Sequence, residues 1–472
     1  MLCLPRVLHA GLRASALGIR GMPSFRTISG QLSTSSKANR EDRRAVISIG
    51  KTGGRMVILG SGWGGLKVLS GIDTSAYEVI VLSPRNHFVF TPLLAGSAVG
   101  TLEFRNITEP VRRHNLQAHY HQAWCQKIDL QKRELTCAPA LPEMEPFKLT
   151  FDKLVIAVGA HSNTFNIPGV EQHGFFLKEI SHAQRVRASL IECFERASEP
   201  NVTDEQQWKL LHFAVVGGGP TGIEFAAELH DFIKDDLRRL YPTLIDKAQI
   251  TVFDVAEKIL GSFDSELAAY ATRKFAREGI KIRTRTFIQE VRKNTLVLKD
   301  TGEEIPFGVL VWATGLTATP LIKAVEATHS KSMRLMTDEY LRVLDKEGKA
   351  IEDVFACGDC AEIKYNLLPA TAQVASQQGI FLRKYLNAVA KGSPEPKPFH
   401  YRHMGSMAYI GGWQAIMDLG QGKNLPKSIR GYFAWLAWRS AYLYKSVSAR
   451  NMVLIPITWF LTFVFGRDIS KF

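Results

Sequence analysis

Short apolar runs that end in glycine recur along the chain and predict buried strands. Residues 55–60 (RMVILG) and 211–217 (LHFAVVG) are two such runs, and the runs at 77–82 and 249–253 follow them. The segment between the members of each pair has helical character. Because strands that alternate with helices form parallel sheets, the pattern predicts an α/β protein.

A glycine-rich turn follows the first run of each pair and opens the intervening helix. One glycine permits a tight turn, the next lets the backbone approach a pyrophosphate, and the last allows close helix–strand packing. We therefore expect two Rossmann-like dinucleotide-binding domains. The glycines that carry this prediction are Gly60, Gly62, Gly65, Gly217, Gly219 and Gly222.

The residue at the end of the next strand indicates how the adenosine ribose would be bound. Asp254 ends the second unit, where a carboxylate accepts bonds from ribose hydroxyls and repels a 2′-phosphate, so this site favours NAD(H) over NADP(H). Ser83 holds the same place in the first unit, where it can still hydrogen-bond but is a weaker signal. Two dinucleotides in one chain indicate electron transfer between them, and a flavin is the natural partner of a nicotinamide.

Three further glycines mark strand ends that would complete the flavin domain. The apolar run at 151–160 contains Gly159, and the run at 306–315 ends at Gly315. The run at 354–361 contains Gly358 and Asp359. In this context Asp359 would accept a hydrogen bond from the ribityl chain of a non-covalently held FAD.

The net charge of +14 lies mostly at the two ends of the chain. Residues 1–40 carry six cations and no acid, and residues 427–472 carry seven cations and one acid. Neither end has aromatics arranged for base stacking, so we expect no nucleic-acid partner. The acid-free, Arg- and Ser-rich start is typical of a mitochondrial transit peptide, and we assign residues 1–50 to targeting and a linker.

The C-terminal tail is aromatic, apolar and cationic. Its uncharged run, 452–465, has 14 residues broken by Pro456, whereas a membrane-spanning helix needs about 20. We expect residues 430–472 to form an amphipathic helical membrane anchor, with Trp435, Trp438 and Trp459 at headgroup depth and the cations on anionic lipid. The alternative is a pair of buried core or dimer-interface helices. The charged stretch 234–239, outside the tail, is expected to be a solvated helix extension.

Other functions remain as alternatives. Cys357 and Cys360 form a C-x-x-C pair, but the Gly-Asp between them is needed for FAD, which argues against a redox dithiol. A sulfide:quinone oxidoreductase does not need a second glycine-rich turn followed by a strand that ends in an acidic residue. This chain has both, which argues against that function. A soluble NADH-dependent flavoprotein reductase would not need the tail. A membrane-associated structural protein could keep nucleotide folds for binding alone. No EF-hand loop occurs, and we expect no metal site.

Several segments together resemble the type II (alternative, non-proton-pumping) NADH:ubiquinone oxidoreductase family of mitochondria. They are VILGSGWGGL, SPRNHFVFTPLL, FFLKE, VVGGGPTGIE, VWATG, FACGDCA, LPATAQVASQQG and the aromatic, cationic tail. The resemblance implies non-covalent FAD, NADH as donor, membrane ubiquinone as acceptor and a rotenone-insensitive respiratory-chain activity without proton pumping. It implies a peripheral, monotopic protein of the mitochondrial inner membrane and a homodimer; the absence of a spanning segment after the targeting peptide favours the matrix side.

The resemblance also assigns catalytic residues. Glu179 matches the family glutamate near flavin and nicotinamide, although the alternative is an acid that caps the helix beginning nearby. Gln373 and Gln377 lie four residues apart on one helix face, and by resemblance they line the meeting place of flavin and quinone. The N-terminus of their helix, at Ala372, can stabilise negative charge on a reduced flavin.

The same reading divides the chain into domains. The FAD domain is expected to comprise residues 55–165 and 321–395, with the NADH-binding domain, 166–320, inserted between them. Residues 399–472 would form the membrane-anchoring and quinone-access region.

Overall fold

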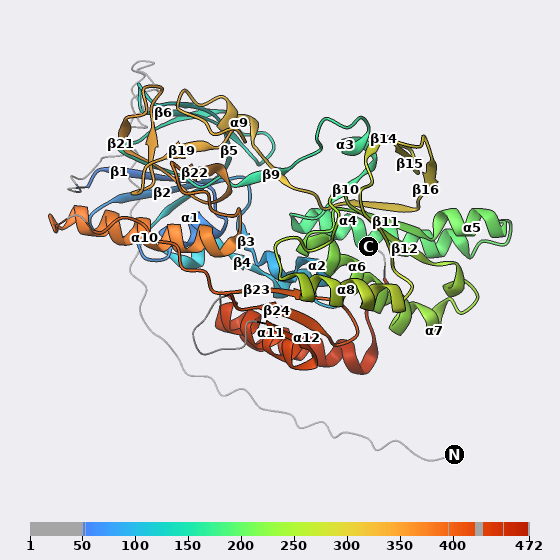
Figure 1. Cartoon of the computed structure of the whole chain (residues 1–472). Helices are drawn as coiled ribbons and strands as arrows, with labels where there is room; N and C mark the ends of the chain where they lie inside the picture. Colours follow the sequence, from blue (N-terminus) through green and yellow to red (C-terminus); the bar gives the residue numbers. More distant parts are fainter. Residues whose placement is uncertain (1–50, 52, 395, 421–427, 447, 471–472) are drawn as a thin grey trace, which may run out of the picture. The chain divides into compact units, whose positions relative to one another are not determined.

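The chain places its apolar runs in two sheets, a mixed sheet with a parallel centre and a smaller parallel sheet (Figure 1). The computed structural model describes residues 51, 53–394, 396–420, 428–446 and 448–470. The predicted targeting segment, 1–50, lies outside these residues. The larger sheet has ten strands in the order β22-β19-β20-β21-β8-β1-β2-β5-β6-β7. Their bounds are β22 (Ala361–Ile363), β19 (Leu335–Thr337), β20 (Arg342–Leu344), β21 (Ala350–Ala356), β8 (Lys153–Ile156), β1 (Arg55–Leu59), β2 (Glu78–Ser83), β5 (His119–Asp129), β6 (Glu134–Pro139) and β7 (Phe147–Thr150).

The centre of this sheet is parallel and buried. Strands β21, β8, β1, β2 and β5 pair in parallel, and Met56, Val57, Ile58 and Leu59 of β1 are almost wholly buried. Such continuous apolar strands need cover on both faces. Helices α1 (Trp63–Leu69) and α10 (Ala372–Ala390) pack on each other beside the sheet (Figure 1), and their backbones approach closely at Gly64 and Gly379.

The smaller parallel sheet has five strands in the order β10-β17-β11-β12-β13. Strand β11 precedes the second glycine-rich turn, and helix α6 follows it. Helix α6 continues through a π-helical turn, η5, into α7, which matches the predicted helix with its extension. Strand β12 has the predicted bounds. The elements of this part are β10 (Phe175–Phe176), β17 (Val309–Trp312), β11 (His212–Val216), β12 (Gln249–Phe253), β13 (Lys281–Arg283), α4 (Ile180–Ala197), α5 (Asp204–Leu210), α6 (Pro220–Phe232), η5 (Ile233–Leu237), α7 (Arg238–Leu240) and α8 (Ser265–Arg277).

Smaller elements connect the two sheets or extend them. A three-stranded antiparallel sheet, β14-β15-β16, adjoins the second unit, and two-stranded sheets pair β3 with β4 and β9 with β18. Their bounds, with those of the short helices, are β3 (His87–Val89), α2 (Leu94–Ser97), β4 (Thr108–Pro110), β9 (Ala160–Ser162), α3 (Val170–His173), β14 (Ile288–Arg292), β15 (Thr295–Leu298), β16 (Glu304–Pro306), β18 (Leu316–Ala318) and α9 (Pro320–Lys323).

The C-terminal part consists of an antiparallel sheet covered by two helices. The sheet has β23 (Ser406–Tyr409), β24 (Ala415–Asp418) and β25 (Ser428–Gly431), and the helices are α11 (Tyr432–Lys445) and α12 (Ala449–Phe465). The sheet contacts α6 and α8 on one side and α11 on the other (Figure 1). Across the described ranges, no helix combines the length and hydropathy needed to cross a bilayer.

Two expectations for this tail are wrong. Pro456 does not break the apolar run, because α12 continues through it. Trp435 and Trp438 are buried, 6% and 5% exposed, and so do not reach headgroup depth. The indole of Trp438 packs on Tyr409 of β23, and that of Trp435 packs on Trp413. These two tryptophans anchor α11 to the body of the protein.

Buried carboxylates on α6 hold β23 and the turn after it. The Glu224 carboxylate accepts a hydrogen bond from the Tyr409 backbone N–H at 3.1 Å. The Asp231 carboxylate accepts from the Tyr409 hydroxyl at 2.5 Å and from the Gly412 N–H at 3.0 Å. The helix that follows the second glycine fingerprint is therefore also the surface on which the C-terminal sheet docks.

Arg467, just beyond α12, ties the end of the chain to the same helix. Its guanidinium donates to Asp236 at 2.6 Å and to the Thr101 hydroxyl at 3.1 Å, and lies 3.9 Å from Glu228. Because Asp236 is ion-paired and half-buried, the expectation that the whole stretch 234–239 is solvated is wrong at this residue. Its other charged side chains, Lys234, Asp235, Arg238 and Arg239, are exposed.

The burial of Glu224 makes stability depend on pH. Desolvation raises its pKa to about 8, well above the ordinary value. The native state therefore keeps a proton that the unfolded chain releases near its ordinary pKa, and stability falls as pH rises through that interval. Glu224→Gln keeps an oxygen acceptor for Tyr409 and removes the titration. We expect wild type and variant to unfold at similar temperatures near about pH 5, and the variant to be more stable by several degrees near about pH 8.5.

The measurement is thermal unfolding followed by circular dichroism across this pH range. Glu199→Gln, at an exposed position, is the matched control and should follow the wild-type curve. Parallel pH curves for wild type and Glu224→Gln would contradict the assignment.

Candidate functional site

The two glycine loops have the same construction. Gly60 has φ of +98° and Gly217 has φ of +115°, in the left-handed region that favours glycine. A Cβ at Gly65 would lie 1.9 Å from the Gly60 carbonyl oxygen, and one at Gly222 would lie 1.9 Å from that of Gly217. Any side chain at these positions would separate helix from strand.

Each loop leaves the N-terminus of its helix open. Gly62 is the N-cap of α1 and Gly219 is the N-cap of α6. Because glycine has no side chain, neither helix has a side-chain capping bond. A Cβ built at either glycine meets nothing within 4 Å. Uncapped backbone N–H groups that face open space attract phosphate. The residues at both loops thus fit the pyrophosphate of a bound dinucleotide.

The strand ends beyond these loops differ. Asp254, after β12, accepts hydrogen bonds from the Gly218 N–H and, at 2.7 Å, from the Ala256 N–H. Its carboxylate therefore lies beside the second glycine loop. At the end of β2, the hydroxyl of Ser83 lies 2.8 Å from that of Ser61, within the first loop. Ser83 is 2% exposed, so its main contact here is with the loop itself.

The predicted flavin-binding glycines lie at the carboxyl ends of parallel strands. Gly159 follows β8, has φ of +72° and would present a Cβ to open space. Gly315 lies between β17 and β18. Gly358 follows β21, has φ of +75°, and its N–H donates to Gln378 at 2.7 Å. Asp359 comes next, with its carboxylate 3.6 Å from the Lys178 ammonium.

Lys178 and Glu179 bring a cation and an anion to this edge. Glu179 is the N-cap of α4, but its side chain makes no capping bond, so the capping alternative is wrong. Instead its carboxylate accepts from the Arg85 guanidinium at 2.7 Å. Burial lowers the pKa of Lys178, although the Asp359 carboxylate opposes that shift. Two adjacent residues therefore face two different partners, Asp359 and Arg85.

Three imidazoles lie near these charges. Burial lowers the pKa of His87, His161 and His182, and the Glu179 carboxylate opposes the shift at each. Neutral imidazoles at pH 7 follow from these shifts. The charges paired with one another here are therefore those of Arg85 with Glu179 and Lys178 with Asp359.

Helix α10 begins beside this region. Its N-cap, Thr371, accepts a hydrogen bond from the Val374 N–H, and Ala372 is its first residue. Gln373 accepts from the Tyr401 hydroxyl at 2.6 Å and from the Met404 N–H at 2.9 Å. Gln377 bonds both backbone groups of Arg402, accepting at 3.0 Å and donating at 2.8 Å. The two glutamines therefore hold the segment that leads into β23.

The C-x-x-C cysteines are buried and free. Burial raises the pKa of Cys357 well above its ordinary value and raises that of Cys360 to about 11. The Cys360 thiol lies 3.2 Å from the Cys357 carbonyl oxygen. Protonated, buried thiols are poor nucleophiles, which argues against a redox pair at this position.

Sequence reasoning missed the partners of the predicted residues. Arg85 lies 94 residues from Glu179, and Tyr401 lies 28 residues from Gln373. Arg85 lies within the quoted SPRNHFVFTPLL segment, but nothing in the spacing points to Glu179. Lys178 also lies in a quoted segment, FFLKE, and its contact with Asp359 depends on the meeting of two distant strand ends.

Family models match most of the chain. Residues 54–379 match the model described as pyridine nucleotide-disulphide oxidoreductase, and residues 403–468 match the NDH2 C-terminal domain. The two matches together include both glycine loops and both C-terminal helices up to Asp468.

Named relatives and a solved structure agree with these models. The chain is 41% identical to the internal alternative NAD(P)H-ubiquinone oxidoreductase A1, mitochondrial, of Arabidopsis thaliana, covering 88% of this chain and 85% of the relative. It is 40% identical to the external alternative NADH-ubiquinone oxidoreductase, mitochondrial, of Yarrowia lipolytica, covering 88% and 80%. The structure of NDH2 from Plasmodium falciparum in complex with NADH has a TM-score of 0.82 at 28% identity, covering 88% of this chain and 99% of that one.

Matched substitutions at the two N-caps should separate the two nucleotide sites. Gly62→Val and Gly219→Val each place a side chain in open space in front of a helix N-terminus. We expect Gly219→Val to retain FAD and lose NADH affinity by about a hundredfold or more, since it would block the phosphate approach. Gly62→Val should fold without FAD.

Flavin absorbance of the purified variants and calorimetric titration with NADH provide the measurements. Each variant serves as the control for the other. Loss of flavin from Gly219→Val, or its retention by Gly62→Val, would contradict the assignment of the two loops.

Proposed function

Because the chain belongs to the type II NADH dehydrogenase family, we infer that it is an FAD-dependent enzyme that transfers electrons from NADH to ubiquinone. The observation that carries this conclusion is the pair of open helix N-termini in one chain, each behind a left-handed glycine. Relatives at 40–41% identity are named ubiquinone oxidoreductases, and the matched NDH2 structure is a complex with NADH.

The alternatives have less support. The match of residues 403–468 to the NDH2 C-terminal domain favours this family over a soluble flavoprotein reductase. The intact second loop, with Asp254 beside it, distinguishes the chain from the sulfide:quinone oxidoreductase that the sequence left open.

We propose that FAD occupies the first loop and NADH the second. Gly60, Gly62 and Gly65 would hold the flavin nucleotide, with Gly159, Gly358 and Asp359 at the adjoining strand ends. Gly217, Gly219 and Gly222 would hold NADH, with Asp254 at the ribose, where its negative charge repels a 2′-phosphate. When bound, FAD would accept a hydride from NADH and pass two electrons on to ubiquinone.

The charged residues between the two loops have positioning roles in this proposal. Arg85 orients the Glu179 carboxylate, and Lys178 partly neutralises Asp359. The N-terminus of α10 at Ala372 directs partial positive charge toward the same region. Gln373 and Gln377 hold the segment at 401–405, which keeps the C-terminal sheet next to the site. Gly315, in the turn between β17 and β18, would adjoin the flavin together with the other strand-end glycines.

We propose that the protein attaches peripherally to the mitochondrial inner membrane through α11 and α12. Support comes from the large apolar side chains that these helices leave exposed. They are Tyr432, Phe433, Leu436, Tyr444, Met452, Val453, Ile457, Phe460, Leu461, Phe463, Val464 and Phe465. Such a surface, with Lys445 and Arg450 exposed beside it, suits an anionic lipid bilayer.

Three finer assignments rest on the sequence and the family alone. They are the matrix face of the membrane, a homodimer and the absence of proton pumping. One relative is named internal and the other external, at nearly equal identity to this chain. The preference for the matrix face follows from the lack of a predicted spanning segment after the predicted targeting peptide.

Stopped-flow absorbance tests the proposed electron route. NADH added without oxygen should bleach the flavin bands of the purified enzyme, and a short-chain ubiquinone added afterwards should restore them. A flavin that NADH bleaches but ubiquinone leaves reduced would contradict the proposed acceptor.

Charged substitutions on the exposed face of α11 and α12 test the membrane contact. Deleting the tail is unsuitable because Trp435, Trp438 and Arg467 are part of the packed body. Phe433→Asp with Phe460→Asp changes two side chains that are 76% and 65% exposed. We expect this variant to stop sedimenting with anionic vesicles and to keep its NADH–ferricyanide activity.

Leu116→Asp with Leu141→Asp is the matched control, because these residues are also exposed but lie in the loops before β5 and after β6. It should still sediment with the vesicles. Equal sedimentation of both double variants would show that α11 and α12 are not the contact.

A further inference from the structure

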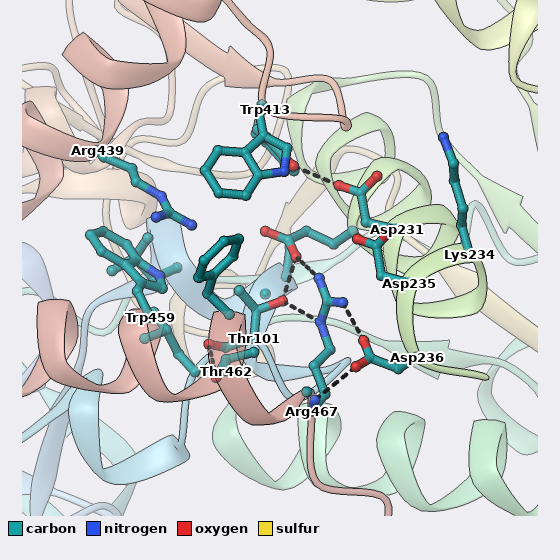
Figure 2. Close-up of a pocket in the computed structure, with 18 of the residues that line it drawn as sticks. Thr101, Asp231, Lys234, Asp235, Asp236, Trp413, Arg439, Trp459, Thr462 and Arg467 are labelled. Atoms are coloured by element: carbon teal, nitrogen blue, oxygen red, sulfur yellow. Dashed lines mark hydrogen bonds and ion pairs between the residues drawn. The ribbon is translucent and has the colours of Figure 1, made fainter. Parts of the chain in front are cut away.

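A cavity lies between α6, the α2 region, and the two C-terminal helices (Figure 2). Its volume is about 460 Å³, within the usual range of roughly 300–1,000 Å³ for ligand pockets. One wall carries the aromatic side chains of the tail, and the other carries the carboxylates of α6. None of the nucleotide-binding glycines lines it.

Arg439 presents a cation to this cavity. Its guanidinium lies between two indoles, 4.4 Å from the ring centre of Trp435 and 4.2 Å from that of Trp459. Figure 2 shows it directed inward, near Trp413. Within the described part of the chain it makes no ion pair, and its buried Nε has no hydrogen-bond partner. Stacking satisfies the faces of a guanidinium but leaves its in-plane N–H donors free.

Apart from the exposed Asp235 at its margin, the carboxylates of the cavity are already engaged by other groups. Asp236 and Glu228 face Arg467, at 2.6 and 3.9 Å. The Thr101 hydroxyl also donates to Glu228, at 2.6 Å. Asp231 accepts the hydrogen bonds from β23 and the turn after it. Glu224, with its pKa raised to about 8 by burial, is largely protonated near neutral pH. Among the charged side chains inside the cavity, Arg439 therefore has no close counterion within the described part of the chain.

The margin of the cavity has an apolar part and a basic part. Phe463 and Val464, 68% and 51% exposed, line it on the side of the proposed membrane face. The exposed cations Lys234, Arg238 and Arg239 outnumber the exposed Asp235 on the side of η5 and α7. An amphiphile with an anionic head and apolar chains matches this arrangement.

We propose that the cavity binds the phosphate group of an anionic phospholipid, with the Arg439 guanidinium as its principal donor and the acyl chains leaving past Phe463 and Val464. A guanidinium fork suits two phosphate oxygens, and the aromatic walls exclude water from the contact. The site rests on the proposed membrane attachment of α11 and α12, and it adds a specific headgroup contact to that apolar surface.

Short-chain lipids below their critical micelle concentration test the site without a membrane. The probe is dihexanoylphosphatidylglycerol, added to full-length, FAD-bound enzyme while flavin release on heating is followed. We expect the wild-type release temperature to rise by several degrees. Arg439→Gln should bind the lipid roughly tenfold or more weakly. Lys445→Gln and Arg450→Gln remove the same charge at exposed positions and should respond as wild type.

Two further probes identify what is recognised. Dihexanoylphosphatidylcholine should give a smaller shift, because its head has no net charge, and inorganic phosphate should give none. An equal shift with inorganic phosphate would replace the lipid by a phosphate anion, and an equal shift in wild type and Arg439→Gln would overturn the proposal.

Further measurements separate loss of the lipid site from misfolding of a variant and from failure of the proposed membrane attachment. If Arg439→Gln does not retain FAD, Arg439→Lys takes its place, since it keeps the charge but loses the planar fork, and it should bind the lipid more weakly than wild type. Quenching of Trp435 and Trp459 fluorescence by a phosphatidylglycerol with a brominated acyl chain reports occupancy in the wild type itself, and no quenching would overturn the site. Vesicle sedimentation tests the apolar face independently of Arg439.

Discussion

The fold depends on two places where a buried parallel strand turns sharply into an uncapped helix. Gly60 and Gly217 adopt left-handed backbone conformations, and Gly65 and Gly222 bring each helix within contact distance of the turn. No side chain caps either helix, and a Cβ built at Gly62 or Gly219 would enter open space. Free N–H groups at a helix N-terminus are stabilised by phosphate, so each of the two loops fits the pyrophosphate of a dinucleotide.

Helix α6 connects one of these sites with the C-terminal part of the chain. Its N-terminus is the second glycine loop, and its buried side holds β23 through Glu224 and Asp231. Arg467 then joins the end of α12 to Asp236, just beyond α6. The proposed membrane face is therefore not an appendage on a flexible linker. The C-terminal helices are thus joined to α6, whose N-terminus is the proposed NADH site, and the cavity with Arg439 lies along this same connection.

Local sequence rules predicted those features that local physics determines. The glycine pattern, the strand at 249–253 and the start of α10 each depend on neighbouring residues, and each appears where it was expected. Features determined by tertiary packing were missed or mistaken. Arg85 reaches Glu179 only because the fold joins residues that are 94 positions apart. The sequence alone predicts membrane-facing side chains for Trp435 and Trp438, but in the fold these side chains are buried against the protein. Likewise, the sequence predicts a solvated Asp236, but in the fold Arg467 forms an ion pair with it. Pro456 was expected to break the apolar run at 452–465, but α12 continues through it.

The most direct measurement of the central claim is the number of nucleotides that one chain holds at the same time. Purified protein, denatured and assayed for released flavin, should yield FAD equal in amount to the protein. Calorimetric titration of the same flavin-loaded protein with NAD⁺ should give one site per chain, with no flavin displaced. Colourless protein, or NAD⁺ that binds only by displacing the flavin, would contradict the account of two independent dinucleotide sites.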